Sequence, residues 1–258
     1  MLLYTPAAMT GGRILLNQAG PGLGLPSVSP FCMRLEAFLR LAGLEYEVDN
    51  KPALGKAPKG KVPWIVDGDA PIADTHFIIE HLKTTRGLTI DARLSAQQRA
   101  IVHACTRMLT ENFYWVLVHS RWLYPPSWAP FKRAFTKIMP PMIGPLIMPL
   151  IRRGIRKQAH AHGMGRHSDA EIAAIARADL EALDALLGES EWFFASAGEG
   201  AGPTSFDATA YTFVAQLLVP PFDTPQRREL KRFPRLVAYT ERAHARLFPE
   251  LPLEYPSL

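Results

Sequence analysis

The chain has 258 residues, 48% of them hydrophobic and 21% charged, which suits one large or two modest globular domains. With only two cysteines, a disulfide framework is excluded. The sequence contains no long apolar stretch without charged residues or prolines, so we predict no membrane-spanning helix. The formal net charge is +5, but segment 112–168 holds nine basic and no acidic residues, against 20 basic and 24 acidic residues elsewhere. No nucleic-acid motif accompanies this charge, so we expect no nucleic-acid binding. The start of the chain does not resemble a signal peptide, which favours a cytoplasmic protein.

The first third of the chain alternates short strands and helices. The predicted elements are, in order, a buried strand at 13–18, a helix from Ser29-Pro30 to Gly43, strands at 45–49, 62–66 and 70–73, and a helix capped by Asp74 or Thr75. The first two strands flank a helix and should be parallel, whereas the tight turn at 67–69 predicts a hairpin. This β-α-β, β-β-α order predicts a thioredoxin-like domain over residues 13–86.

From residue 95 onward the pattern is helical. The predicted helices are a long amphipathic one that starts with a capping-box pattern at 95–98, a second at 169–187 that ends at Gly188, a third capped by 204–207, and a fourth that starts at Pro234. No strand pattern of similar strength occurs. The sequence therefore predicts an all-helical domain over residues 95–250, with the boundary near 87–94.

Three loops of the first domain carry chemically useful groups to one edge of the predicted fold. They contain Ser29-Pro30-Phe31-Cys32 at a helix start, Lys61-Val62-Pro63 before a strand, and Ala73-Asp74-Thr75 at the next helix start. A helix N-terminus with a hydroxyl at its cap stabilises a thiolate. We predict a cis bond before the strand-initial proline, which would turn the preceding backbone outward to pair with an extended peptide. The acidic and hydroxyl side chains of the third loop would hold an ammonium and a carboxylate group, so the loops together predict a site for a thiol-containing peptide.

These three motifs resemble the glutathione-binding motifs of the cytosolic glutathione transferases. In the helical half, the stretches 163–168, 192–194 and 203–208 resemble the branch of that family related to the failed-axon-connections and metaxin proteins. The resemblance covers roughly residues 13–250, nearly the whole chain. It implies glutathione as co-substrate, a helical glutathione-transferase domain after the thioredoxin-like one, and a homodimer.

The resemblance also implies roles for individual residues. Ser29 matches the hydroxyl that activates glutathione, and Val62, between Lys61 and Pro63, matches the position that holds the glutathione cysteine. Asp74 and Thr75 match the pair that binds the γ-glutamyl end, although Glu-Ser is the commoner pair. Asp207 matches the aspartate of the helix N-capping box that stabilises the second domain.

Some of these residues also have a purely structural interpretation. Ser29 would then be only a helix cap, worth about 1 kcal/mol. Cys32 would be a small buried hydrophobe rather than a redox thiol, and Cys105 a core residue. The histidines at 160, 162 and 167 have no carboxylate or thiolate near them in sequence before residue 169, so we expect no metal site.

Segment 128–157 combines an apolar, proline-rich stretch with flanking basic residues. Prolines at 140, 141, 145 and 149 exclude one straight helix and predict a kinked or two-piece element. We rank three roles in this order: a hydrophobic flap or subunit interface, an apolar acceptor site with a basic rim, and a contact with an anionic membrane surface.

The expected function is that of a glutathione S-transferase-like enzyme, in which the glutathione thiolate attacks a largely apolar electrophile. One alternative is a non-catalytic adaptor of the same fold that docks a partner or a membrane surface. A second alternative is a glutathione-dependent thiol oxidoreductase that uses Cys32.

Overall fold

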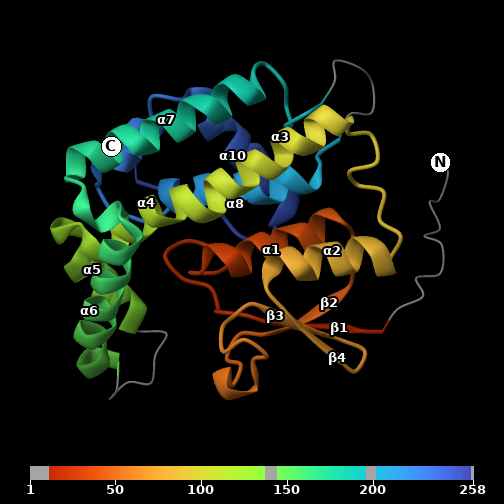
Figure 1. Cartoon of the computed structure of the whole chain (residues 1–258), viewed down its shortest axis with the longest axis horizontal. Coiled ribbons are helices and arrows are strands. Elements are labelled where there is room, and N and C mark those ends of the chain that lie inside the picture. Colours follow the sequence, from red (N-terminus) through yellow and green to blue (C-terminus); the bar gives the residue numbers. More distant parts are fainter. Residues whose placement is uncertain (1–11, 137–143, 196–201, 257–258) are drawn as a thin grey trace.

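The computed structural model describes residues 12–136, 144–195 and 202–256 (Figure 1). Its first half contains a four-stranded sheet of order β2-β1-β3-β4, in which β1 is parallel to β2 and antiparallel to β3, and β4 is antiparallel to β3. The strands are β1 (Ile14–Asn17), β2 (Tyr46–Asp49), β3 (Trp64–Asp67) and β4 (Ala70–Ala73). Helices α1 (Pro30–Leu41) and α2 (Thr75–Thr85) lie between this sheet and the helical half (Figure 1), and a 3₁₀ turn, η1 (Leu54–Lys56), precedes β3.

The described part of the second half contains helices joined by turns and loops, and no strand. Its elements are α3 (Ala96–Arg107), the π-helical η2 (Met108–Phe113), α4 (Tyr114–Val118), the π-helical η3 (His119–Leu123), α5 (Pro125–Thr136), α6 (Gly144–His162), the 3₁₀ turn η4 (Met164–Arg166), α7 (Asp169–Leu187), α8 (Ser205–Leu218), α9 (Pro225–Leu230) and α10 (Pro234–Leu247). The first four of these follow one another without a break, so the long predicted helix continues past residue 117. Two stretches of π-helix widen it.

One hydrophobic core joins the two halves. All fourteen residues of α8 are buried, and this helix packs against α1, which buries nine of its twelve residues. The buried cluster runs from Leu16 and Phe38 of the thioredoxin-like half to Phe206 and Phe213 of the helical half. The two halves therefore share one close-packed core and are not independent bodies.

The predicted fold class is confirmed: a thioredoxin-like first half is followed by a helical second half. The predicted strands agree with the observed ones within two residues at each end, and the helix at 169–187 ends at Gly188 as expected. Helix α9 was not predicted as a separate element, whereas the kinked or two-piece element predicted in the proline-rich segment is present as α5 and α6. The proline-rich segment forms two helices with Pro130 and Pro149 inside them, and the prolines at 140 and 141 lie outside the described residues. None of the helices described is long and apolar enough to cross a membrane.

Candidate functional site

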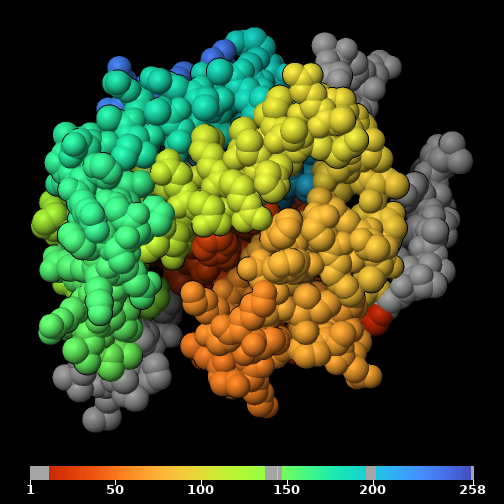
Figure 2. Space-filling model, in the orientation of Figure 1, coloured from red at the N-terminus to blue at the C-terminus, as the bar shows by residue number. Residues whose placement is uncertain are grey.

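A polar cavity of about 260 Å³ opens between the loops of the thioredoxin-like half and the helix α3–η2. Figure 2 shows the hollow between the orange and the yellow parts of the surface, with red atoms at its floor. The residues that line it are Phe31, Arg34, Lys59, Lys61, Val62, Pro63, Ala73, Asp74, Thr75, His76, Arg107, Thr110 and Glu111. Five of the predicted site residues, from the second and third loops, thus lie in one cavity.

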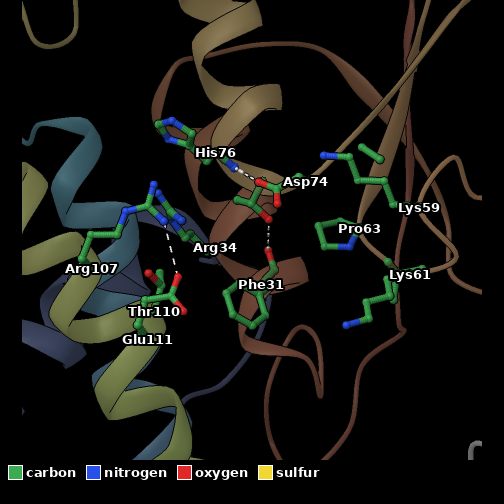
Figure 3. A pocket seen from close by; sticks show the side chains of 13 residues that line it. Phe31, Arg34, Lys59, Lys61, Pro63, Asp74, His76, Arg107, Thr110 and Glu111 are labelled. Carbon is green, nitrogen blue, oxygen red and sulfur yellow. Dashed lines mark hydrogen bonds and ion pairs between the residues drawn. The ribbon is translucent and has the colours of Figure 1, made fainter. Parts of the chain in front are cut away.

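Asp74 precedes α2 with a φ of 80°, a conformation that residues other than glycine seldom adopt. Its Oδ1 atom accepts a hydrogen bond of 2.9 Å from the His76 backbone N–H, so the side chain caps the helix (Figure 3). Strained backbone of this kind persists at sites where the surrounding structure holds it in place. The exposed carboxylate lines the cavity and is placed to accept a hydrogen bond from an ammonium group.

Thr75 is buried, and its hydroxyl donates a 3.3 Å hydrogen bond to the carbonyl oxygen of Phe31. This contact ties the start of α2 to the first turn of α1. The first turn of α2, whose Thr75 and His76 line the cavity, is therefore held in place, and a helix N-terminus favours an anionic group.

Cations outnumber acids around the cavity. Arg34 and Arg107 lie on one side of it and the two lysines, Lys59 and Lys61, on the other (Figure 3), against the carboxylates of Asp74 and Glu111. Arg34 is buried and donates from Nε to Thr209 Oγ1 at 2.9 Å; burial lowers its pKa to about 10, which leaves it charged at neutral pH. The arrangement suits a ligand with two carboxylates and one ammonium group.

The Val62–Pro63 peptide bond is cis, as predicted, and both residues line the polar cavity. Neither the N–H nor the C=O of Val62 forms a backbone hydrogen bond with another described residue. This leaves one donor and one acceptor at the cavity wall for an extended peptide.

A second, apolar cavity of about 270 Å³ adjoins the first, and Phe31 and Val62 line both. Its other lining residues are Ala19, Val28, Ser29, Pro30, Tyr114, Leu117, Val118, Arg121, Trp122, Phe131 and Phe135. Aromatic side chains of η3 and α5 dominate one wall, with Trp122 and Phe131 ring centroids 4.7 Å apart. The cavity is therefore suited to a small apolar molecule.

Ser29 lies in the wall of this apolar cavity rather than in the polar one. It is the N-cap of α1, and its Oγ atom accepts a 3.4 Å hydrogen bond from the Cys32 backbone N–H. Because the Oγ atom is the acceptor in that bond, the bond does not use the hydroxyl proton. Because Phe31 and Val62 belong to both cavities, Ser29 lies next to their junction.

Cys32 has no exposed surface, and its Sγ atom accepts a 3.5 Å hydrogen bond from the Ala19 backbone N–H. Burial raises the pKa of this thiol, although hydrogen bonds with Ser29 and the Ala19 backbone oppose the shift. Reactive cysteines occupy accessible, electropositive positions that lower the pKa. The environment of Cys32 is the opposite of that, so it gives no support to redox chemistry at this residue.

Two further predicted positions lie away from both cavities. Asp207 is buried at the start of α8 and accepts hydrogen bonds from the backbone N–H groups of Thr204 and Phe193 at 2.7 and 3.0 Å, which completes a capping box. Cys105 is half-buried on α3 and packs against the core. Within the described residues, no group of three or more His, Cys, Asp or Glu side chains is arranged to hold a metal ion.

The sequence reasoning missed the residues that the helical half contributes. Arg107 and Glu111 are spaced i,i+4 on one helix and form an ion pair with a distance of 3.4 Å between Nη1 and Oε1. Arg34 and Arg121 were also missed, because arginines in helices are ordinarily solvated. A signal was present for Arg34, which interrupts the apolar stretch 31–35, but not for Arg121, which follows His119 and Ser120.

Comparison with known proteins gives matches over both halves. Residues 30–127 match the family model of the glutathione S-transferase N-terminal domain, and residues 176–243 match that of the C-terminal domain. Isoprene-epoxide–glutathione S-transferase of Rhodococcus sp. (strain AD45) is 30% identical over 230 residues, which cover 86% of this chain and 94% of that protein.

Longer relatives match as well. Failed axon connections of Drosophila melanogaster is 30% identical over 242 residues, or 88% of this chain, but the chain spans only 56% of that protein. Metaxin-1 of Macaca fascicularis is 26% identical over 76% of this chain, which spans 63% of that protein. A solved glutathione S-transferase of Methylobacterium radiotolerans in complex with glutathione sulfonate has the same fold, with a TM-score of 0.57, 17% identity and coverage of 95% of this chain and 97% of that one.

Proposed function

Because the chain belongs to the glutathione S-transferase family, in the branch with Failed axon connections and metaxin, we propose that it transfers glutathione to an apolar electrophile. The observation that carries the proposal is the pair of adjoining cavities, one polar and cationic, the other apolar and aromatic. Their shared wall is where a sulfur atom would leave the first cavity and meet a carbon atom in the second.

In the proposed complex, glutathione lies in the polar cavity. The carboxylate of Asp74 accepts hydrogen bonds from the γ-glutamyl ammonium group, and the first turn of α2 binds the neighbouring carboxylate. The free N–H and C=O of Val62 pair with the cysteine of glutathione, and the basic side chains on either side attract its second carboxylate. The Ser29 hydroxyl then donates a hydrogen bond to the thiolate.

We further propose an epoxide as the first class of electrophile to test, since the Rhodococcus relative is named for one. The thiolate sulfur would attack a ring carbon as the carbon–oxygen bond breaks, and the alkoxide that forms would take up a proton. The aromatic walls of the apolar cavity would hold the hydrocarbon part of the molecule and exclude water.

Glutathione binding is tested by thermal unfolding of the wild-type protein and of Asp74→Ala in a glutathione titration. A ligand at 100 times its Kd stabilises the native state by about 2.7 kcal/mol. We expect the melting temperature of the wild type to rise, and that of the variant to rise much less. Asp49→Ala is the matched control. The Asp49 side chain also accepts a hydrogen bond from the backbone N–H two residues later, that of Lys51, at 2.8 Å, but Asp49 lines neither cavity. A wild-type protein whose melting temperature does not respond to glutathione would refute the proposal.

The role of Ser29 is tested by the rate of conjugation. We expect Ser29→Ala to bind glutathione but to conjugate it to the epoxide about 100-fold more slowly, as for loss of one hydrogen bond to a developing anion. Ser95→Ala is the control, because Ser95 is also an N-cap that accepts a backbone N–H, at 3.1 Å, on a helix start away from the cavities. If both variants conjugate glutathione at the same rate, Ser29 acts only as a helix cap and has no role in the reaction.

A second candidate function, contact with an anionic membrane surface, rests on the helices α5 and α6, which project from the rest of the molecule (Figure 1). Leu150 on α6 is 69% exposed, and Arg153, Arg156 and Lys157 of the same helix are exposed as well. Basic side chains near an anionic surface each contribute about 1 kcal/mol of binding. We expect sedimentation with phosphatidylserine vesicles that falls at high salt and is lost when these three cations are changed to alanine; binding that persists contradicts the candidate.

The homodimer also stays a proposal, which the family resemblance supports. Light scattering should give twice the chain mass of 28.7 kDa. A monomeric mass at micromolar concentration contradicts it.

A further inference from the structure

Arg121 is a buried arginine in the wall of the apolar cavity. It lies on η3 and is 5% exposed. Its Nη1 atom donates to the carbonyl oxygen of Val28 at 3.0 Å, and its Nη2 atom donates to the backbone carbonyl of Gln216 at 2.6 Å and to the side-chain oxygen of the same residue. Its Nε atom has no hydrogen-bond partner among the described residues.

No carboxylate compensates this charge. The three acceptors are uncharged, and no acidic residue lines the apolar cavity in the part of the chain that the structure describes. Burial lowers the pKa of Arg121 to about 10, so the side chain is still a cation at neutral pH. A buried cation without a counter-charge is costly to fold. By contrast, the buried guanidinium of Arg86 forms an ion pair with Asp67.

The position of the uncompensated charge is next to the expected reaction centre. The carbonyl that binds Nη1 belongs to Val28, the residue before Ser29, and both Ser29 and Arg121 line the same cavity. The remaining lining is mainly apolar and aromatic, with Trp122, Phe131 and others excluding water. In such surroundings a charge acts over a longer distance than in solvent.

We propose that the Arg121 guanidinium is the counter-charge of the glutathione thiolate, and that it lowers the pKa of the bound thiol across the apolar cavity. The proposal rests on the proposed function, since it assigns a role in that same site. Arg121 needs no contact with sulfur for this effect. The backbone carbonyls of Val28 and Gln216 fix its position, and the charge is supplied by the protein before the ligand binds.

The other titratable groups around the cavity do not supply a negative charge. Tyr114 of α4 lines the cavity, and burial raises its pKa although Arg121 opposes the shift. Cys32 of α1 contacts the lining residue Ala19, and burial raises the pKa of its thiol too. Both groups are neutral at pH 7, and α5 and α8 present Phe131 and the uncharged Gln216. Glu36 of α1, whose charge acts on Cys32, lines neither cavity and forms an ion pair with Arg40 at 3.3 Å. The thiolate would therefore be the one anion against the described lining of the apolar cavity.

The test measures the thiolate directly, by its ultraviolet absorbance in complexes of the protein with glutathione over a range of pH. We expect the wild type to give a thiol pKa below that of free glutathione. Arg121→Met removes the positive charge and should raise that pKa by about one to two units, where one unit corresponds to 1.36 kcal/mol of differential interaction. Arg121→Lys should restore most of the shift because it keeps the charge. Arg227→Met is the matched control: Arg227 is equally buried and donates to backbone carbonyls of Leu218 and Pro256, but lines neither cavity.

The outcomes separate this inference from the proposed function. If the wild type binds no glutathione, the proposed function fails. If Arg121→Met binds glutathione with an unchanged thiol pKa, or if Arg227→Met shifts it equally, the role of Arg121 is overturned while the transferase proposal stands.

A measurement on the wild type alone covers the case in which Arg121→Met does not fold. Glutathione sulfonate carries a negative charge at the sulfur position, whereas S-methylglutathione is neutral there. A counter-charge predicts that the wild type binds the sulfonate at least about tenfold more tightly, a difference of about 1.4 kcal/mol. Equal affinity for the two ligands overturns the inference.

Discussion

The carboxyl group of Asp179 couples protonation to folding. It is buried on α7, where Oδ2 accepts a 2.7 Å hydrogen bond from the Asn112 side chain, and burial raises its pKa from 3.8 to about 6. The native state therefore binds this proton more tightly than the unfolded chain does. Its contribution to stability is fully present below about pH 3.8 and is lost as the pH rises through about 6.

Replacing this carboxyl by an amide should remove the coupling. We expect Asp179→Asn to raise the free energy of unfolding at neutral pH by about 1–3 kcal/mol and to flatten its dependence on pH between about 4 and 6. Urea denaturation across this range measures both effects. Glu181→Gln, at an exposed position of the same helix, is the control and should leave the profile unchanged. A profile of Asp179→Asn that matches the wild type would contradict the shifted pKa.

At the same scale, the residues of the three predicted loops were easier to find than their partners. Lys61, Pro63 and Asp74 stand beside turns and helix starts, where local sequence fixes the conformation. Arg107 and Arg121 come from a helix that is distant in sequence, and only the packing of the two halves brings them to the cavities. No local pattern encodes that packing.

Among the elements, α7 and α8 begin with the same device in different surroundings. Both have a capping box, with Ser168 and Glu171 at α7 and Thr204 and Asp207 at α8. Asp207 is 1% exposed and also accepts a hydrogen bond from the Tyr239 hydroxyl at 3.2 Å, whereas Glu171 is exposed to solvent. Loss of the buried carboxylate leaves several hydrogen-bond donors without an acceptor, and water does not reach this buried position to take its place.

The two boxes should therefore differ in their contribution to stability. We expect Asp207→Ala to lower the free energy of unfolding by about 3 kcal/mol or more, and Glu171→Ala to have a much smaller effect. Thermal and urea denaturation of the two variants measure the difference. Similar losses in both would show that capping, rather than burial, sets the contribution.

Elements with regular patterns were predicted with their bounds, whereas α5 and α6 were predicted only as one kinked or two-piece element. The strands and α7 follow the alternation and the cap residues that define them. Helices α5 and α6 contain Pro130 and Pro149, which local propensity assigns to breaks, yet packing of Phe131 and Met148 in one apolar cluster holds both helices. The π-helical stretches have no signature in the sequence that periodicity detects.

For the whole molecule, the shared core predicts cooperative unfolding. Arg34 of α1 donates to Thr209 of α8, and Gln216 of α8 donates to the Ser27 carbonyl at 2.9 Å, in addition to the apolar contacts between these helices. We expect far-ultraviolet circular dichroism, which reports mainly on the helical half, and fluorescence of a variant that keeps only Trp64 to follow the same denaturation curve. Two separate midpoints would show that the halves fold independently.

The burial of Cys32 has a consequence for the durability of the protein. An enzyme that binds electrophiles exposes its own side chains to them. An accessible cysteine thiolate near the binding site would be alkylated over time, and that residue would lose its function. In this chain Ser29 lines the apolar cavity, whereas the thiol of Cys32 has no exposed surface and burial raises its pKa. On the proposed function, no cysteine of the described cavity lining would compete with the glutathione sulfur for the electrophile.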